Sequence, residues 1–372
     1  MYPSLYIHIP FCSSKCFYCS FASFENRDEL IAPYLEALKK EAALYRGQKI
    51  STVYIGGGTP TYLDVACLKA LFSLINIYFV FGSDSEVTIE ANPTAFDPKK
   101  IKVLGDGGVN RVSLGVQSFS DKNLNWLGRS HSRVCAISTF NALRKAGFKN
   151  LNLDLIYSLP GQSEKDIKKD VSELISLDSE HVSLYALTVS GGSKLAERKV
   201  EPPMPDSQAR HYLQVTELLK KAGFLHYEVS NFAKQGFECR HNMNYWRGGD
   251  YIGLGASAHS HLSGRRFWNV KDPETYVRAL KAGSGIQASA QAGEEKLNKD
   301  ERFMEAFLIG LRLTEGVDIL ELGSRFNAAL TLDKKEQIND FVREGLLSRD
   351  QNRIRATMSG MVILDEICSR LI

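Results

Sequence analysis

The sequence predicts an α/β protein that is built on a parallel sheet and ends in a separate helical unit. Short runs rich in β-branched and aromatic residues recur roughly every 30–45 residues, and a stretch with helical spacing of apolar residues follows each run. Six such units in a row fit either a doubly wound sheet or an incomplete (β/α) barrel. The alternation fades after about residue 225, so a complete barrel is not expected.

The six expected strands precede six expected helices in strict alternation. The strands span residues 5–9, 52–55, 86–90, 111–116, 152–156 and 182–187. The helices span residues 30–45, 63–79, 98–104, 134–146, 164–175 and 206–222. Glycine and proline follow several of the strands, at the positions where parallel α/β folds build ligand sites.

Composition divides the chain into three parts. Residues 1–235 carry the βα repeat, and residues 236–300 form an extension that ends in a polar linker at 281–300. Residues 301–372 resemble a winged helix. In that last part helices are expected at 302–313, 332–344 and 359–371, with a two-stranded wing at 346–355.

Charge and hydropathy exclude some functions. The 46 Lys and Arg residues nearly balance the 43 Asp and Glu residues, and charges in the C-terminal part are mixed, so a nucleic-acid partner is not expected. The start of the chain has no secretory signal pattern, and the longest apolar stretch, residues 70–81, is too short to span a bilayer. We therefore expect a cytoplasmic protein that is not integral to a membrane.

Three of the seven cysteines form the most informative motif. Cys12, Cys16 and Cys19 follow the first strand with the spacing C-x3-C-x2-C. Three thiolates on one short loop can hold three irons of a [4Fe–4S] cluster, which leaves the fourth iron without a protein ligand. A zinc site with His8 as fourth ligand is the alternative. The other cysteines are expected to be small core residues, and they are Cys67, Cys135, Cys239 and Cys368.

This motif, placed directly after the first strand of a βα repeat, resembles that of the radical S-adenosylmethionine (SAM) enzymes. The fuller string from Tyr6 to Cys19 is similar to the branch that contains oxygen-independent coproporphyrinogen III dehydrogenases and a group of heme chaperones. The resemblance runs along almost the whole chain. It implies an incomplete (β/α)6 barrel, a [4Fe–4S] cluster, and SAM that chelates the open iron through its amino and carboxylate groups.

Further residues carry over from the family as SAM contacts. The glycine-rich loop after the second strand would receive the SAM amino group, and an arginine would pair with the SAM carboxylate in the fork geometry that arginine favours. Polar residues at the carboxyl ends of later strands would supply the remaining SAM contacts. The residues so assigned are Tyr6, Tyr18, Gly57, Gly58, Thr59, Glu90, Gln117, Arg129 and Asp154.

The string His241-Asn242-Met243-Asn244-Tyr245-Trp246 admits two interpretations. His241 could be an axial ligand beside aromatics that cover a planar macrocycle, or a buried structural histidine among core aromatics. The pattern H-N-x-x-Y-W is typical of the heme chaperones of this branch, so His241 is assigned as the heme contact. His259 and His261 are weaker candidates.

Two departures separate the chain from the dehydrogenases. Those enzymes continue their motif to a further cysteine where this chain has Phe21, and they carry an N-terminal arm before the first strand, whereas Tyr6 lies near the start here. In a third departure, residues 190–193 replace a glutamate-proline turn that is common in the family, which affects local loop contacts only.

The resemblance implies a heme chaperone, a monomer or homodimer, that passes heme to respiratory proteins, whether or not it cleaves SAM. The alternative is oxidative decarboxylation of coproporphyrinogen III. A third hypothesis is a nucleic-acid-binding protein that contains zinc.

Overall fold

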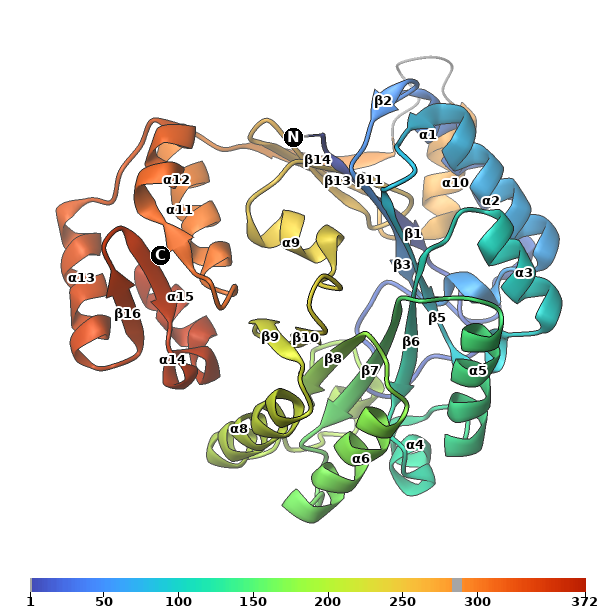
Figure 1. Cartoon of the computed structure of the whole chain (residues 1–372). Helices are drawn as coiled ribbons and strands as arrows, with labels where there is room; N and C mark the ends of the chain where they lie inside the picture. The colour runs from blue at the N-terminus through green and yellow to red at the C-terminus, as the bar shows by residue number, and fades with distance from the viewer. Residues whose placement is uncertain (1, 283–289) are drawn as a thin grey trace.

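The computed structural model describes residues 2–282 and 290–372. Its main body is a curved twelve-stranded sheet whose helices cover the outer face, and a smaller C-terminal unit lies beside it (Figure 1). The six central strands are β1 (Ser4–Ile9), β3 (Thr52–Gly57), β5 (Glu86–Ala91), β6 (Arg111–Gln117), β7 (Leu151–Tyr157) and β8 (His181–Ala186). Each lies within two residues of the strand expected from the sequence.

The order of these strands identifies the architecture. They are neighbours in chain order and all run parallel. A doubly wound sheet would reverse its strand order at the first strand, so that alternative is wrong and the incomplete barrel is confirmed. Among the described residues, the two edge strands, β14 (Gln291–Lys296) and β9 (Leu225–Glu228), do not pair with each other, so the barrel stays open.

Helices connect the strands and pack against the outer face of the sheet. The predicted helices correspond to α1 (Ile31–Ala43), α2 (Val65–Tyr78), α3 (Pro98–Asp106), α5 (Arg133–Lys145), α6 (Glu164–Ser176) and α8 (Pro205–Lys221). Ser163 shows why one of them begins where it does, since it caps α6 in a capping box with Asp166. Shorter elements were not expected from the sequence: β2 (Gln48–Lys49), β4 (Phe79–Val80), α4 (Asp121–Leu127) and α7 (Lys194–Glu197).

The segment after β8 extends the sheet at both edges. At one edge β10 (Asn231–Ala233) pairs antiparallel with β8 and β9. At the other edge β11 (Tyr251–Leu254) pairs parallel with β1, and an antiparallel series follows. The remaining elements of this segment are α9 (Arg240–Trp246), β12 (His259–Leu262), β13 (Arg265–Asn269) and α10 (Pro273–Ala282).

The prediction of a linker at 281–300 is wrong for part of its length. Residues 291–296 form β14, which pairs with β13 from Arg265 to Asn269. The polar sequence of β14 arises because it is an edge strand with mostly exposed side chains. Residues 283–289 of the expected linker lie outside the described residues.

The C-terminal unit matches the expected winged-helix pattern. Its elements are α11 (Lys299–Gly310), β15 (Val317–Asp318), α12 (Ile319–Phe326), α13 (Leu332–Arg343), β16 (Leu347–Asp350), β17 (Arg353–Ala356), α14 (Met358–Val362) and α15 (Leu364–Leu371). The short β15 adds a third strand to the wing. The single closing helix that was expected is broken at Ile363, whose φ of −121° is not helical. Within the described ranges, every helix is too short or too polar to span a bilayer.

Glu41, on α1, fastens the extension to the barrel. Its carboxylate is 7% exposed and accepts hydrogen bonds from the Gly255 backbone (2.8 Å), the Asn269 amide (2.6 Å) and the Tyr276 hydroxyl (2.6 Å). These donors come from the turn after β11, from β13 and from α10. Burial raises the pKa of Glu41 to about 6.

We predict that Glu41→Ala lowers the free energy of unfolding by about 3 kcal/mol, because three buried donors lose their acceptor. Glu36→Ala, at an exposed position of the same helix, should change it by less than about 0.5 kcal/mol. Urea unfolding of both variants checks this. Equal effects of the two substitutions would contradict a fastening role for Glu41.

Candidate functional site

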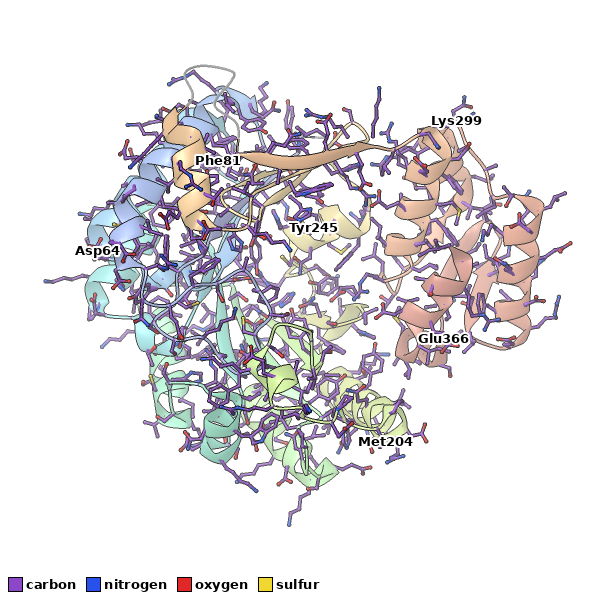
Figure 2. All side chains as sticks on the ribbon, turned by 180° about the vertical axis from the view of Figure 1, so that it is seen from behind. Asp64, Phe81, Met204, Tyr245, Lys299 and Glu366 are labelled. Atoms are coloured by element: carbon purple, nitrogen blue, oxygen red, sulfur yellow. The ribbon has the colours of Figure 1, made fainter. Side chains whose placement is uncertain are left out.

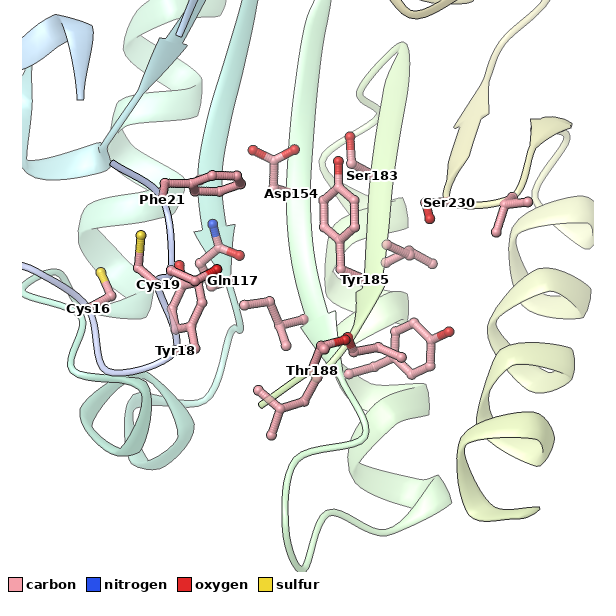
Figure 3. Close-up of a pocket in the computed structure, with 18 of the residues that line it drawn as sticks. Cys16, Tyr18, Cys19, Phe21, Gln117, Asp154, Ser183, Tyr185, Thr188 and Ser230 are labelled. Atoms are coloured by element: carbon pink, nitrogen blue, oxygen red, sulfur yellow. The ribbon is translucent and has the colours of Figure 1, made fainter. Parts of the chain in front are cut away.

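The carboxyl ends of the parallel strands open onto a cavity of about 780 Å³, which we call the rim cavity. Figure 3 shows Cys16, Cys19 and Tyr18 on one wall of it, with Asp154 and Tyr185 across from them. Most of the residues singled out from the sequence line this cavity: Cys12, Cys16, Tyr18, Cys19, Gly57, Gly58, Thr59, Glu90, Gln117, Arg129 and Asp154.

The three cysteines lie on the loop between β1 and α1. Cys12 is buried, and its Sγ lies 3.5 Å from the Thr59 hydroxyl, whereas Cys16 and Cys19 are half-buried. An N–H of the Arg129 guanidinium donates to Cys16 Sγ at 3.3 Å. Burial raises the pKa of Cys12 to about 11. Three thiols at one cavity wall, one beside an arginine, fit the ligand set of an iron–sulfur cluster.

The zinc alternative finds little support in the geometry. Across the described ranges, no three His, Cys, Asp or Glu side chains converge as the ligands of one metal ion do, whereas a four-iron cluster binds each thiolate to a separate iron. His8 is already engaged, because its Nε2 donates to the Ala22 carbonyl at 2.8 Å and its Nδ1 accepts from the Tyr6 hydroxyl at 2.9 Å.

Glycines let the loop after β3 approach the cysteine loop. A Cβ on Gly58 would lie 2.9 Å from Cys12 Sγ, and one on Gly57 would lie 2.7 Å from the His8 ring. Gly57 also has a φ of +116°, which disfavours any side chain. A larger residue at Gly58 would have to move the cysteine loop, and one at Gly57 would have to move the His8 ring on β1.

Glu90 lies at the end of β5, in the wall of the rim cavity. Its carboxylate accepts from the Tyr54 hydroxyl at 2.9 Å and from the Gly57 backbone at 3.1 Å. Burial raises the pKa of Glu90 to about 7, so the side chain is partly protonated near neutral pH. A cationic group bound beside it would favour the ionised form.

Three further polar side chains are positioned by β6 and β7. A bulge in the pairing of these strands lies between Gly115 and Gln117, and Gln117 has a φ of +67°. The bulge redirects the Gln117 side chain. Arg129 donates to the Gly115 carbonyl at 2.7 Å. Asp154 accepts from the Asn152 amide at 2.6 Å, and burial raises its pKa.

Of the residues assigned to SAM or heme from the sequence, Tyr6 and His241 lie away from the rim cavity, as do the weaker candidates His259 and His261. Tyr6 lines a second cavity, described below, rather than the rim cavity. His241 is 1% exposed and lines neither of the two. The Thr52 hydroxyl donates to Ser4, so His241 Nδ1 donates to Thr52 (2.8 Å) and Nε2 accepts from the Tyr245 hydroxyl (2.9 Å).

The surroundings of His241 therefore match the alternative of a buried structural histidine. Desolvation lowers its pKa to about 3, so the ring stays neutral. Iron coordination by His241 would first have to displace the Tyr245 hydroxyl. Among the other cysteines, Cys239 is buried as expected, but Cys67, Cys135 and Cys368 are only half-buried.

The second cavity, which we call the extension cavity, has a volume of about 580 Å³. Residues of β1, the cysteine loop, the extension and the C-terminal unit line it, and Figure 2 shows Tyr245 between the sheet and that unit. Its lining includes Tyr245, Trp246, His259 and His261 together with Arg302. Sequence reasoning missed Arg302, because nothing in the sequence tells which face of α11 turns toward the extension.

Sequence reasoning also missed the far wall of the rim cavity. Tyr185 on β8 lies beside Asp154 there (Figure 3). Residues 361–366 of the C-terminal unit also line the cavity. Tyr185 occupies a strand end like the other rim residues, and that position is the signal that could have found it.

Comparisons with known proteins agree with this geometry. Residues 6–174 match the model of the radical SAM superfamily, and residues 297–363 match the HemN C-terminal domain. The heme chaperone HemW of Lactococcus lactis is 36% identical over 99% of this chain and 97% of its own length. HemW of Bacillus subtilis is 34% identical over 98% and 97%, respectively.

The chain belongs to the HemW heme chaperone family. Its relatives include HemW of Escherichia coli, which is 35% identical over 82% of this chain and 83% of its own length. The structure of coproporphyrinogen III oxidase (HemN) from Escherichia coli superimposes with a TM-score of 0.86, covering 100% of this chain and 90% of that one at 24% identity. That likeness shows that HemW-family and HemN chains share the fold, a radical SAM partial barrel followed by a C-terminal helical domain.

The pKa of Glu90 predicts a pH dependence of stability for the apoprotein. Its folded-state value of about 7 lies above the ordinary 4.5, so the folded state binds the extra proton between these values. Stability should therefore fall as the pH rises from about 4.5 to about 7, by up to about 3 kcal/mol.

Glu90→Gln should reduce this slope and leave the smaller contribution of Glu41, whose pKa is also raised, while Glu201→Gln, at an exposed position, should leave the slope unchanged. Urea midpoints at several pH values measure both. A slope of the same size in Glu90→Gln and in the unaltered protein would show that Glu90 does not contribute to it.

Proposed function

We propose that this protein is a heme chaperone that binds heme, a [4Fe–4S] cluster and SAM, and delivers heme to respiratory proteins. The observation that carries the proposal is the full-length similarity to proteins named heme chaperone HemW. The rim cavity supports the binding of the cluster and SAM, because three cysteines and the polar residues at the strand ends line it together.

The residues that line the rim cavity fall into those that hold the cluster and those that contact SAM. Cys12, Cys16 and Cys19 hold the cluster, which when present supplies an electron to SAM. Gly57, Gly58 and Thr59 receive the amino group of SAM, and Arg129 holds its carboxylate. The remaining contacts come from Tyr18, Glu90, Gln117 and Asp154. Tyr6 does not contact SAM directly. Its hydroxyl donates to the His8 ring and so positions that side chain.

The arrangement suits a zwitterionic ligand that also carries a sulfonium charge. Glu90 and Asp154 are buried carboxyl groups with raised pKa values, and a cation in the cavity would favour their ionised forms. Arg129 supplies the matching positive charge, 3.3 Å from Cys16 Sγ. Binding of a cationic ligand would then release protons from the carboxyl groups.

We place the protein in the cytoplasm, as a monomer or homodimer. None of its seven cysteines is in a disulfide, which suits a reducing compartment. We also propose the division into residues 1–235, 236–300 and 301–372 as the three functional parts, with the rim cavity in the first and closed off in part by the third.

Oxidative decarboxylation of coproporphyrinogen III is the second candidate. The observation that favours it is the fold shared with HemN over the whole chain. Purified protein loaded with its cluster and SAM is mixed with hemin in one assay, and in another with coproporphyrinogen III, a one-electron reductant of the cluster and an electron acceptor, which separates the two functions. We expect retained heme and no decarboxylation, and the opposite pair of results would refute the chaperone.

We predict that Cys12→Ala, Cys16→Ala and Cys19→Ala each abolish the cluster after anaerobic reconstitution, because a cluster with two protein ligands is not held. Cys135→Ala removes a cysteine on α5, outside the rim cavity, and should retain full iron and sulfide. Iron and sulfide analysis with visible absorption measures all four. Full iron in any of the first three would remove that cysteine from the ligand set.

A further inference from the structure

The extension cavity has the size and lining of a site for a large flat ligand. Its volume of about 580 Å³ falls within the roughly 300–1,000 Å³ of small-molecule and cofactor sites. Ala306 and Ile309 on α11 and Phe326 on α12 give it an apolar wall. Tyr245 and Trp246 from α9 add aromatic surface to the same lining.

The cavity is also lined by two histidines, His259 and His261, whose rings make no hydrogen bond among the described residues. His259 and His261 lie on β12 two residues apart, so their side chains share one face of the strand. His259 is exposed and stacks on Trp268 with ring centroids 5.7 Å apart. His261 Nε2 is buried with no hydrogen-bond partner among the described residues, and Asp250 lies 3.7 Å from its Nδ1.

A carboxylate behind one ring nitrogen is the usual second partner of a metal-binding histidine, since it orients the ring and raises its basicity. Asp250 lies 3.7 Å from His261 Nδ1, beyond hydrogen-bond distance but close enough to become such a partner, and the ring makes no hydrogen bond among the described residues. His241, by contrast, has both nitrogens in hydrogen bonds and is separated from the cavity by Tyr245. The histidines of β12 are thus better placed to hold iron than the one in the H-N-x-x-Y-W string.

Arg302 supplies a positive charge at the same cavity. Its Nε has no hydrogen-bond partner within the described ranges, and its Cζ lies 5.1 Å from the centre of the Phe326 ring. The other cavity arginine, Arg266, is already paired with Glu295 and Glu305. An unpaired guanidinium beside an apolar wall suits a ligand that is flat and apolar with carboxylates at its edge.

We propose that the extension cavity is the heme site: a histidine of the β12 pair, His259 or His261, ligates the iron, and Arg302 binds a propionate. This inference rests on the proposed heme-chaperone function and deepens it by locating the cargo. It also assigns His241 a positioning role, in which it holds Tyr245 as part of the cavity wall.

The test is hemin titration of the full chain, followed by Soret absorption and by electron paramagnetic resonance of the ferric iron. The double variant His259→Gln/His261→Gln should lose the imidazole-ligated spectrum and bind hemin at least about ten-fold more weakly, a loss of about 1.4 kcal/mol. Imidazole added in solution should restore the ligated spectrum. The two single variants then show which ring binds iron.

Matched variants test the other parts of the site. Arg302→Gln should weaken hemin binding several-fold with the spectrum unchanged, while Arg278→Gln, at an exposed position of α10, should have no effect. His241→Gln keeps groups that can bond Thr52 and Tyr245, and it should retain the ligated spectrum. Thermal melts of every variant confirm that each is folded.

The outcomes separate the site from the function. If the unaltered protein binds no hemin, the proposed chaperone function fails. If it binds hemin and the folded double variant keeps the same spectrum and affinity, the extension cavity is not the heme site and the proposal is overturned. Loss of the ligated spectrum in His241→Gln but not in the double variant would overturn it equally.

Discussion

The parallel pairing of β1 on both of its edges is the constraint on which the rest of the molecule depends. β1 bonds β3 on one side and β11 on the other. Its odd-numbered residues, Leu5, Ile7 and Ile9, are completely buried in the core. Tyr6 and His8 face the other way, toward the extension cavity. Because the cysteine loop follows Ile9 directly, one strand sets the position of both cavities.

The two cavities share a wall as a result. Phe21, on the cysteine loop, is 67% exposed and lines both of them. The rim cavity contains the buried carboxyl groups of Glu90 and Asp154, whereas aromatic and aliphatic side chains make up more of the wall of the extension cavity. A zwitterionic ligand would therefore bind preferentially in the rim cavity and an apolar macrocycle in the extension cavity. Because the cysteine loop lines both cavities, a substitution in it would alter both.

The sequence was sufficient for the parts of the fold that follow from local pattern. The six parallel strands are short, mostly buried segments in which β-branched and other apolar residues recur at least at every second position, and each precedes a helical pattern. Glu90 and Gln117 could be placed because they lie at the ends of such segments. The extension was missed because β12 to β14 are antiparallel and partly exposed, without that signature. Which cavity Tyr6 faces, and whether His241 has a free nitrogen, depend on partners distant in sequence, such as Thr52.

The central claim is that cluster-bound SAM and heme occupy separate cavities on the two sides of β1. The most direct measurement is a hemin titration of cluster-loaded protein with and without saturating SAM, with bound SAM quantified in the same samples. The account predicts one heme per chain in both titrations, with SAM retained throughout. Mutually exclusive binding, in which hemin displaces SAM mole for mole, would contradict it.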